Sequence, residues 1–223
     1  TSSQEEDLRA RVRQASAADS AALAKAFDRL DMPGREAVTL RPVHLVEEID
    51  SLNGELQESL FNAVYRAGLA QAQDAYDRAV RDVFETLDML EDRLTGQRFL
   101  FGGALSETDV RLFVCLVRFD QVYHSHFRCS RRRLVDYPAL WAHTRDLFSW
   151  RGVAGLVDFD VIRRGYFLND GDSNPHGILP LAPDIDWSVP HGREHLGPAA
   201  LFGRDGSLVR IDPLRMQPLT EAA

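Results

Sequence analysis

The sequence is poor in cysteine and has no excess of positive charge, and each scarcity excludes a class of protein. Two cysteines among 223 residues, Cys115 and Cys129, are too few for a disulfide framework. Neither lies in a CxxC or metal-ligand spacing, so we expect a reducing, cytoplasmic setting. The 34 acidic residues outnumber the 26 basic ones and give a net charge of -8. A general attraction to nucleic acid is therefore not expected.

Long apolar runs and internal repeats are also missing. No window approaches the apolar length of a membrane span, and the charged start of the sequence, TSSQEEDLRARVR, does not resemble a signal peptide. No similarity recurs at the periods of solenoid proteins. The hydrophobic content of 44% is nevertheless normal for a globular core. We expect a globular chain without export or membrane insertion.

The stretch from Leu105 to Cys129 carries the strongest local signal. Ser106 is followed three residues later by Asp109, a spacing that predicts a capping box at the start of a helix. The apolar run from Leu112 to Val117 leaves no polar face, which predicts a helix surrounded by protein. Polar and aromatic residues then gather at its far end: Arg118, Asp120, Tyr123, His124, His126 and Arg128.

Apolar residues spaced by three or four predict further helices. One runs from His44 to Gly68 and another from Gln73 to Leu94, and the two can pair as an antiparallel hairpin. Asp136-Tyr137-Pro138 marks another helix start. A final helix is predicted from Val153 to Tyr166. Its inward residues would be Leu156, Val157, Val161 and Ile162. Because strands do not alternate with helices, we predict an all-α bundle.

We expect three parts along the chain. Residues 1–40 form an N-terminal helical arm and linker, residues 41–167 a helical domain, and residues 168–223 an irregular C-terminal extension. The stretch 168–198 is rich in Pro, Gly, Asp and Asn, which favours an ordered wrapping segment over regular structure. Residues 199–211 can form a small hairpin around Asp205-Gly206.

Several short motifs, in order and at matching separations, resemble one family. They are Val64-Tyr65-Arg66-Ala67-Gly68, Asp109-Val110-Arg111-Leu112-Phe113, Val117-Arg118-Phe119-Asp120, Val122-Tyr123, His126-Phe127-Arg128-Cys129, Asp136-Tyr137-Pro138 and Asn174-Pro175-x-Gly177-Ile178-x-Pro180. From about Ala17 to Leu196 the chain is similar to the C-terminal half of the Xi-class glutathione transferases, the glutathionyl-hydroquinone reductases. The resemblance implies a glutathione-transferase C-terminal-like helical bundle, in which Ser106 and Asp109 nucleate folding.

The thiol chemistry of that family has no clear counterpart in this sequence. Family members have an N-terminal thioredoxin-like domain whose cysteine attacks the glutathionyl sulfur, and no segment resembles it. Asp19-Ser20 resembles the pair that grips the thiol's γ-glutamyl end, although without the neighbouring strands a plain helix cap is the favoured interpretation. Cys115 should be an inert core residue, whereas Cys129 has arginines nearby that could lower its pKa. No cofactor is expected, with glutathione or another low-molecular-weight thiol as the alternative.

The resemblance also implies an aromatic site. Tyr65, Tyr123 and Tyr166 match tyrosines that line the family's aromatic pocket and bind a quinol oxygen. Such phenols can bind or protonate an oxygen on a small aromatic ligand. His124 is a further catalytic candidate, because histidine suits proton transfer near neutral pH. The substrate-binding candidates are Arg118, Asp120, His126 and Arg128.

Two of these interpretations have simpler alternatives. Arg118 and Asp120 can instead pair with each other or with helix ends. His124 and His126 do not make a metal site, since the sequence places no third ligand beside them. Three positions also depart from the family pattern, which weakens the case for a hydroquinone-type substrate: Gln121 replaces proline, Gly165 replaces histidine and Phe167 replaces a second tyrosine.

Three functions remain open at this point. The first is an enzyme acting on a small aromatic compound without thiol chemistry, as a lyase, isomerase, cyclase or hydrolase. The second is a non-catalytic ligand-binding or interaction module. The third is the helical half of a split reductase, whose thioredoxin-like half is supplied by a partner chain. A homodimer is expected in each case.

Overall fold

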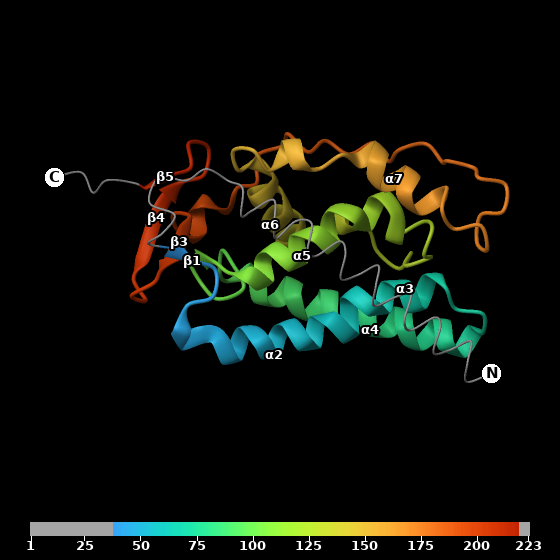
Figure 1. Cartoon of the computed structure of the whole chain (residues 1–223), viewed down its shortest axis with the longest axis horizontal. Helices are drawn as coiled ribbons and strands as arrows, with labels where there is room; N and C mark the ends of the chain where they lie inside the picture. The colour runs from blue at the N-terminus through green and yellow to red at the C-terminus, as the bar shows by residue number, and fades with distance from the viewer. Residues whose placement is uncertain (1–37, 219–223) are drawn as a thin grey trace.

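The computed structural model of the chain describes residues 38–218. A bundle of helices occupies most of the molecule, and a small sheet lies at one end of it (Figure 1). The helices are α2 Val46–Leu56, α3 Asn62–Gly68, α4 Gln73–Thr95, α5 Glu107–Arg118, α6 Pro138–Ser149 and α7 Phe159–Phe167. The strands are β1 Val38–Thr39, β2 Ala104–Leu105, β3 Ala200–Gly203, β4 Leu208–Asp212 and β5 Gln217–Pro218. The predicted helices before residue 31 lie outside the described residues.

The first predicted hairpin is present, with one irregularity. A 3-10 turn, Val43–Leu45, leads into α2, and a π-helical turn, Gln57–Phe61, joins α2 to α3. The chain then reverses through a short turn, so that α3 packs against α4 (Figure 1). Ile49, Leu56 and Val64 are fully buried, as the spacing of apolar residues predicts.

The start and burial of α5 are confirmed. The Ser106 hydroxyl accepts a hydrogen bond from the Asp109 amide, and the Asp109 carboxylate accepts one from the Ser106 amide at 2.9 Å. These two bonds satisfy amides that the first turn of a helix leaves unpaired. Every residue from Leu112 to Val117 is buried. A second π-helical turn, Phe119–Tyr123, continues the helix beyond Arg118.

The final predicted helix is wrong in its length and in two of its inward residues. A short 3-10 turn, Ala154–Leu156, ends before α7, which starts only at Phe159. The break lies at Asp158, whose carboxylate accepts a hydrogen bond from the Val161 amide at 3.0 Å and caps a new helix. Leu156 is 44% exposed and Val161 63% exposed.

The sheet makes the all-α prediction incomplete. Strand β3 pairs antiparallel with β1 and β4 and parallel with β2, and β5 extends the sheet beyond β4. The hairpin formed by β3 and β4 confirms the predicted turn at Asp205-Gly206, where Gly206 has a φ of 87° that favours glycine. Strands β1 and β2 are two residues long, too short to show an alternating pattern.

Residues 168–198 form the ordered wrapping segment that their composition predicts. The only regular structure that they contain is the 3-10 turn Arg193–Leu196. Arginines of the helical bundle bind its backbone: Arg163 donates to the Pro180 carbonyl, and Arg145 donates to the Val189 carbonyl at 2.9 Å. Trp187 anchors the segment by packing its ring 4.9 Å from that of Trp141. The boundaries of the three expected parts stay a prediction.

Buried charged groups hold the sheet end of the bundle together. Arg98 donates to both carboxylate oxygens of Asp146, at 2.8 and 3.0 Å, and both side chains are almost completely buried. Asp109 accepts a hydrogen bond from the Leu100 amide at 2.8 Å, and His143 Nε2 lies 3.0 Å from the same carboxylate oxygen. Each buried charge therefore has partners that offset the loss of water.

None of the helices between Val38 and Pro218 has both the length and the apolar character needed to cross a membrane.

Candidate functional site

Three tyrosines from separate parts of the chain bring their hydroxyl groups together. The hydroxyl oxygens of Tyr65, on α3, and Tyr166, on α7, are 2.7 Å apart. The hydroxyl oxygen of Tyr123, at the end of the second π turn, lies 3.1 Å from that of Tyr166. Both distances are those of hydrogen bonds. The convergence that the sequence predicts is therefore present, and we call these three residues the tyrosine cluster.

Two π turns set the direction of these side chains. The turn Gln57–Phe61 precedes Tyr65 on the same continuous helix, and the turn Phe119–Tyr123 contains Tyr123 itself. Each π turn adds a residue and rotates the following side chains by about 100° relative to an uninterrupted α-helix. Such turns occur frequently at functional sites. Apolar residues spaced by three or four positions do not reveal a π turn, so neither turn was predicted.

Tyr123 is the member of the tyrosine cluster whose pKa is clearly shifted. Tyr123 is only 3% exposed, and burial raises its pKa well above the usual value for a phenol. The neighbouring hydroxyls of Tyr166 and Tyr65 raise that pKa further, while the positive charge of Arg118 opposes the shift. Tyr123 therefore keeps its proton and remains a hydrogen-bond donor.

Arg118 and His124 differ in their relation to the cluster. Arg118 donates to the Val114 carbonyl at 2.6 Å, and its charge acts on the Tyr123 phenol. The His124 ring makes no hydrogen bond to the three phenols in the part of the chain that the structure describes. Its charge acts instead on the carboxylate of Asp120. The catalytic role of His124 stays a prediction, without support from its position.

The side chains of Asp120 and Arg128 form hydrogen bonds with backbone groups of other segments of the chain. The Asp120 carboxylate accepts hydrogen bonds from the Leu134 amide at 2.6 Å and the Val135 amide at 3.2 Å. Arg128 donates to the Gly68 carbonyl at 2.7 Å, at the C-terminal end of α3. For Asp120 this is the alternative that the sequence left open. The geometry favours structural roles for both residues over substrate binding.

His126 connects the wrapping segment to the region around the cluster. Its Nε2 atom lies 3.0 Å from the Asp170 carboxylate, and its ring packs 4.4 Å from that of Phe167. Burial lowers the pKa of His126, although the Asp170 carboxylate acts in the opposite direction. His126 therefore contacts Asp170 and Phe167 and does not lie among the hydroxyls of the tyrosine cluster.

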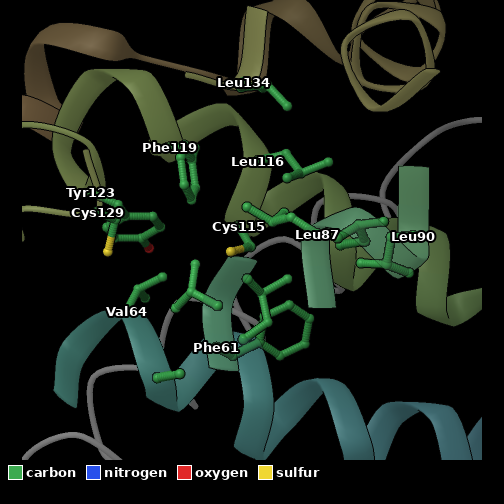
Figure 2. Close-up of a cluster of buried hydrophobic side chains, with 14 of the residues drawn as sticks. Phe61, Val64, Leu87, Leu90, Cys115, Leu116, Phe119, Tyr123, Cys129 and Leu134 are labelled. Carbon is green, nitrogen blue, oxygen red and sulfur yellow. The ribbon is translucent and has the colours of Figure 1, made fainter. Parts of the chain in front are cut away.

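Neither cysteine is suited to nucleophilic chemistry. Cys115 is 5% exposed and Cys129 is completely buried. Figure 2 shows both sulfur atoms among apolar side chains, including Val64 and Leu116. Burial raises the pKa of Cys129 to about 12, more than the nearby Arg128 can offset. The Cys129 thiol thus stays protonated at neutral pH, and burial keeps both thiols away from a substrate.

Sequence reasoning missed two residues beside the cluster. The Phe127 ring contacts the rings of all three tyrosines, and Gly68 lies directly against Phe127. Both belong to the motifs that carry the family resemblance, but neither has a polar group that would suggest a role. Among residues 38–218, no group of three or more His, Cys, Asp or Glu side chains is arranged to hold a metal ion.

Comparison with known proteins decides the family. A family model described as "Glutathione S-transferase, C-terminal domain" matches residues 73–146. The glutathionyl-hydroquinone reductase YqjG of Escherichia coli is 44% identical over 169 residues, covering 76% of this chain and 51% of the relative. The solved Xi-class glutathione transferase of Natrialba magadii is 40% identical, with a TM-score of 0.69, and the match covers 71% of this chain and 49% of that one. The homologues of this chain are Xi-class glutathione transferases, and residues 73–146 match the glutathione S-transferase C-terminal domain.

This assignment confirms the predicted family and the glutathione-transferase-like helical bundle. A second relative, the glutathionyl-hydroquinone reductase PcpF of Sphingobium chlorophenolicum, is 43% identical over 142 residues, or 64% of this chain and 45% of the relative. The chain thus spans about half the length of the curated relatives it matches. The comparisons therefore show Xi-class homologues, whereas the activity of those longer proteins is a proposal for this chain.

Proposed function

We propose that this chain binds a small phenolic or quinone-like compound. The phenol or quinone oxygen of the ligand would lie at the tyrosine cluster. The convergence of three phenol hydroxyls, at 2.7 and 3.1 Å, is the observation that carries the proposal. The relatives named as glutathionyl-hydroquinone reductases support the same class of ligand. Hydroxyls that bond to one another can also bond to a ligand oxygen, because each phenol both donates and accepts.

The chemistry that these residues can perform is proton transfer to an aromatic oxygen. A neutral phenol close to a ketone or phenolate oxygen can donate its proton or stabilise negative charge as it develops. Both cysteines are buried, and the Cys129 thiol keeps its proton, so a reaction carried out by the three tyrosines alone is independent of thiols. Tyr65, Tyr123 and Tyr166 are the proposed catalytic residues.

A second function is favoured by the relatives. The domain can serve as the aromatic-binding half of a glutathionyl-hydroquinone reductase, with the reactive cysteine supplied by a thioredoxin-like domain on a partner chain. The burial of both cysteines supports this arrangement, because the reactive thiol would then come from the partner chain. Glutathione should then raise the melting temperature only when the partner chain is present. Stabilisation of this chain alone by glutathione would contradict the split arrangement.

A thermal-shift screen of phenols, quinones and polycyclic aromatics tests the proposed ligand class. A compound at 100 times its Kd should stabilise the fold by about 2.7 kcal/mol. Tyr166→Phe removes the hydroxyl that both other phenols contact and should weaken binding about tenfold. Tyr76→Phe is the matched control, because its hydroxyl donates to the Arg128 carbonyl and not to the cluster. Equal binding by all three proteins would exclude the tyrosine cluster as the site.

A further inference from the structure

We propose that Phe127 is a positioning residue that sets the spacing of the three phenols, and that Gly68 is glycine because it makes room for Phe127. The proposal rests on the proposed function, since the spacing matters for activity only if the cluster binds a ligand. Neither residue donates or accepts a side-chain hydrogen bond. Their effect is therefore on the geometry of the residues that do.

The Phe127 ring packs on one side of the three tyrosine rings and contacts each of them. Its ring centroid is 5.2 Å from that of Tyr65, 5.6 Å from that of Tyr123 and 5.7 Å from that of Tyr166. The ring stacks on Tyr123 with an angle of 14° between the planes and meets Tyr166 edge-on at 75°. These are the distances and orientations that attract aromatic rings to one another. A single rigid side chain thus touches all three phenol rings at once.

Gly68 allows this position. A Cβ atom at residue 68 would lie 2.2 Å from Cδ1 and 2.4 Å from Cγ of Phe127, much closer than real atoms approach. The backbone of Gly68 belongs to α3 and has no positive φ, so conformational freedom does not explain the glycine. Space explains it. Any larger residue would displace the Phe127 ring from its place against α3.

The backbone on either side of Phe127 is held in place. Arg128 donates to the carbonyls of Ala67 and Gly68, at 3.2 and 2.7 Å, and so ties the Phe127 segment to the end of α3. The Cys129 amide donates to the Tyr123 carbonyl at 2.9 Å. On the other side, His126 contacts Asp170 of the wrapping segment. The Phe127 ring is therefore fixed by its backbone and can in turn fix the positions of the phenol rings.

Changes at Phe127 should alter the phenols without altering the rest of the fold. Replacing the flat ring by a smaller or more flexible side chain leaves space into which Tyr65, Tyr123 and Tyr166 can move. Hydrogen bonds weaken steeply when distance and angle depart from their optimum. The hydroxyl contacts at 2.7 and 3.1 Å should then lengthen or become variable.

The experiment uses the full chain with tyrosine labelled at Cζ with carbon-13, because that carbon reports the state of the hydroxyl. The chain has five tyrosines, and single Tyr→Phe variants assign their signals. Phe127→Leu, and Phe127→Met as a second variant with a longer and unbranched side chain, should shift the signals of the three cluster tyrosines and leave that of Tyr137 unchanged. Phe113→Leu is the control, since Phe113 is fully buried in a different apolar core.

Binding of 4-nitrophenol to the same proteins separates this inference from the proposed function. We expect binding to the Phe127 variants to be about tenfold weaker than to the wild type and binding to Phe113→Leu to be within about twofold. If the wild type does not bind any compound of the screen but the three signals shift together, the proposed function fails and the positioning role stands. If the folded Phe127 variants show unshifted cluster signals, or bind as Phe113→Leu does, the positioning role is overturned.

Discussion

The two ends of α5 bury polar groups in different ways. At its start, the Asp109 carboxylate accepts hydrogen bonds from the Leu100 and Ser106 amides and lies close to the His143 ring. Beyond its far end, Tyr123 is neutral and shares its hydrogen bond with another phenol. The first arrangement fixes the chain's own backbone. The second brings together hydroxyls that belong to different helices.

The difference follows from the cost of burying a charge. A carboxylate left without partners in the interior is strongly destabilising, so its bonds to the backbone and to His143 cannot be given up. Exchanging one hydrogen-bond partner of a neutral phenol for another costs far less free energy, so a ligand oxygen can replace a neighbouring hydroxyl. The Asp109 end is therefore suited to holding the fold, and the tyrosine cluster to binding something that comes and goes.

The largest effect should come from Asp109→Ala. The variant removes the capping box and the partner of His143 together, and we expect the free energy of unfolding to fall by about 4 kcal/mol. Urea unfolding followed by circular dichroism measures this loss. Asp74→Ala is the control, because Asp74 makes only an exposed pair with Arg78 on α4. Similar losses for the two variants would remove the distinction between the ends of α5.

Arg98→Met should have the next largest effect. It leaves the buried Asp146 carboxylate without its two-point partner, at an expected cost of about 3 kcal/mol. Replacing both residues, as Arg98→Met with Asp146→Leu, should recover part of the loss, because no unpaired charge then remains in the core. The same urea titrations measure both variants. A double variant less stable than the single one would show that the carboxylate matters for more than this pair.

Tyr166→Phe should have a smaller effect on stability than either change at the charged end. It removes a hydroxyl but no charge, so the free energy of unfolding should fall by about 1 kcal/mol. Ligand binding should nevertheless decline, as described above. A loss of stability as large as that of Asp109→Ala would mean that the tyrosine cluster also holds the fold.

The smallest effect should be a pH dependence that involves His126. Because burial lowers the pKa of this histidine below its unfolded value of 6.5, the unfolded chain takes up its proton first. The stability that the neutral ring contributes is fully present above that value and is lost as the pH falls below it. The groups that act on the ring are Asp170, which favours protonation, and Arg128, which opposes it. His126→Gln should therefore lose less stability than the wild type between about pH 7.5 and pH 5 in urea titrations.

Sequence patterns predicted the features that depend on neighbouring residues. The capping box at Ser106 and Asp109, the start of α6 at Pro138 and the hairpin turn at Asp205-Gly206 each follow from local chemistry, and each is confirmed. The motifs also pointed to the three tyrosines. What the patterns missed depends on distant contacts: the two-residue strands β1 and β2 exist only because β3 pairs with them.

The predicted roles at the far end of α5 show the same limit. Asp120, His126 and Arg128 have the residue types of a binding site, yet their partners are backbone groups and Asp170. Only the folded positions of residues 134, 68 and 170 reveal this. Phe127 shows the converse, because a side chain without polar atoms contacts the rings of all three tyrosines.

The place of β3 in the sheet has a consequence for synthesis on the ribosome. Strands β1 and β2 emerge long before β3, which pairs with both, and β4 follows it. The helical bundle can begin to form while about the last 20 described residues are still to be translated, because proteins fold progressively as they are made. The sheet cannot. Formation of the sheet should therefore be the last step in the folding of this end of the molecule. A nascent chain stalled before residue 200 should already contain the helices of the bundle. It should still be cut by protease at residues 38–39 and 104–105.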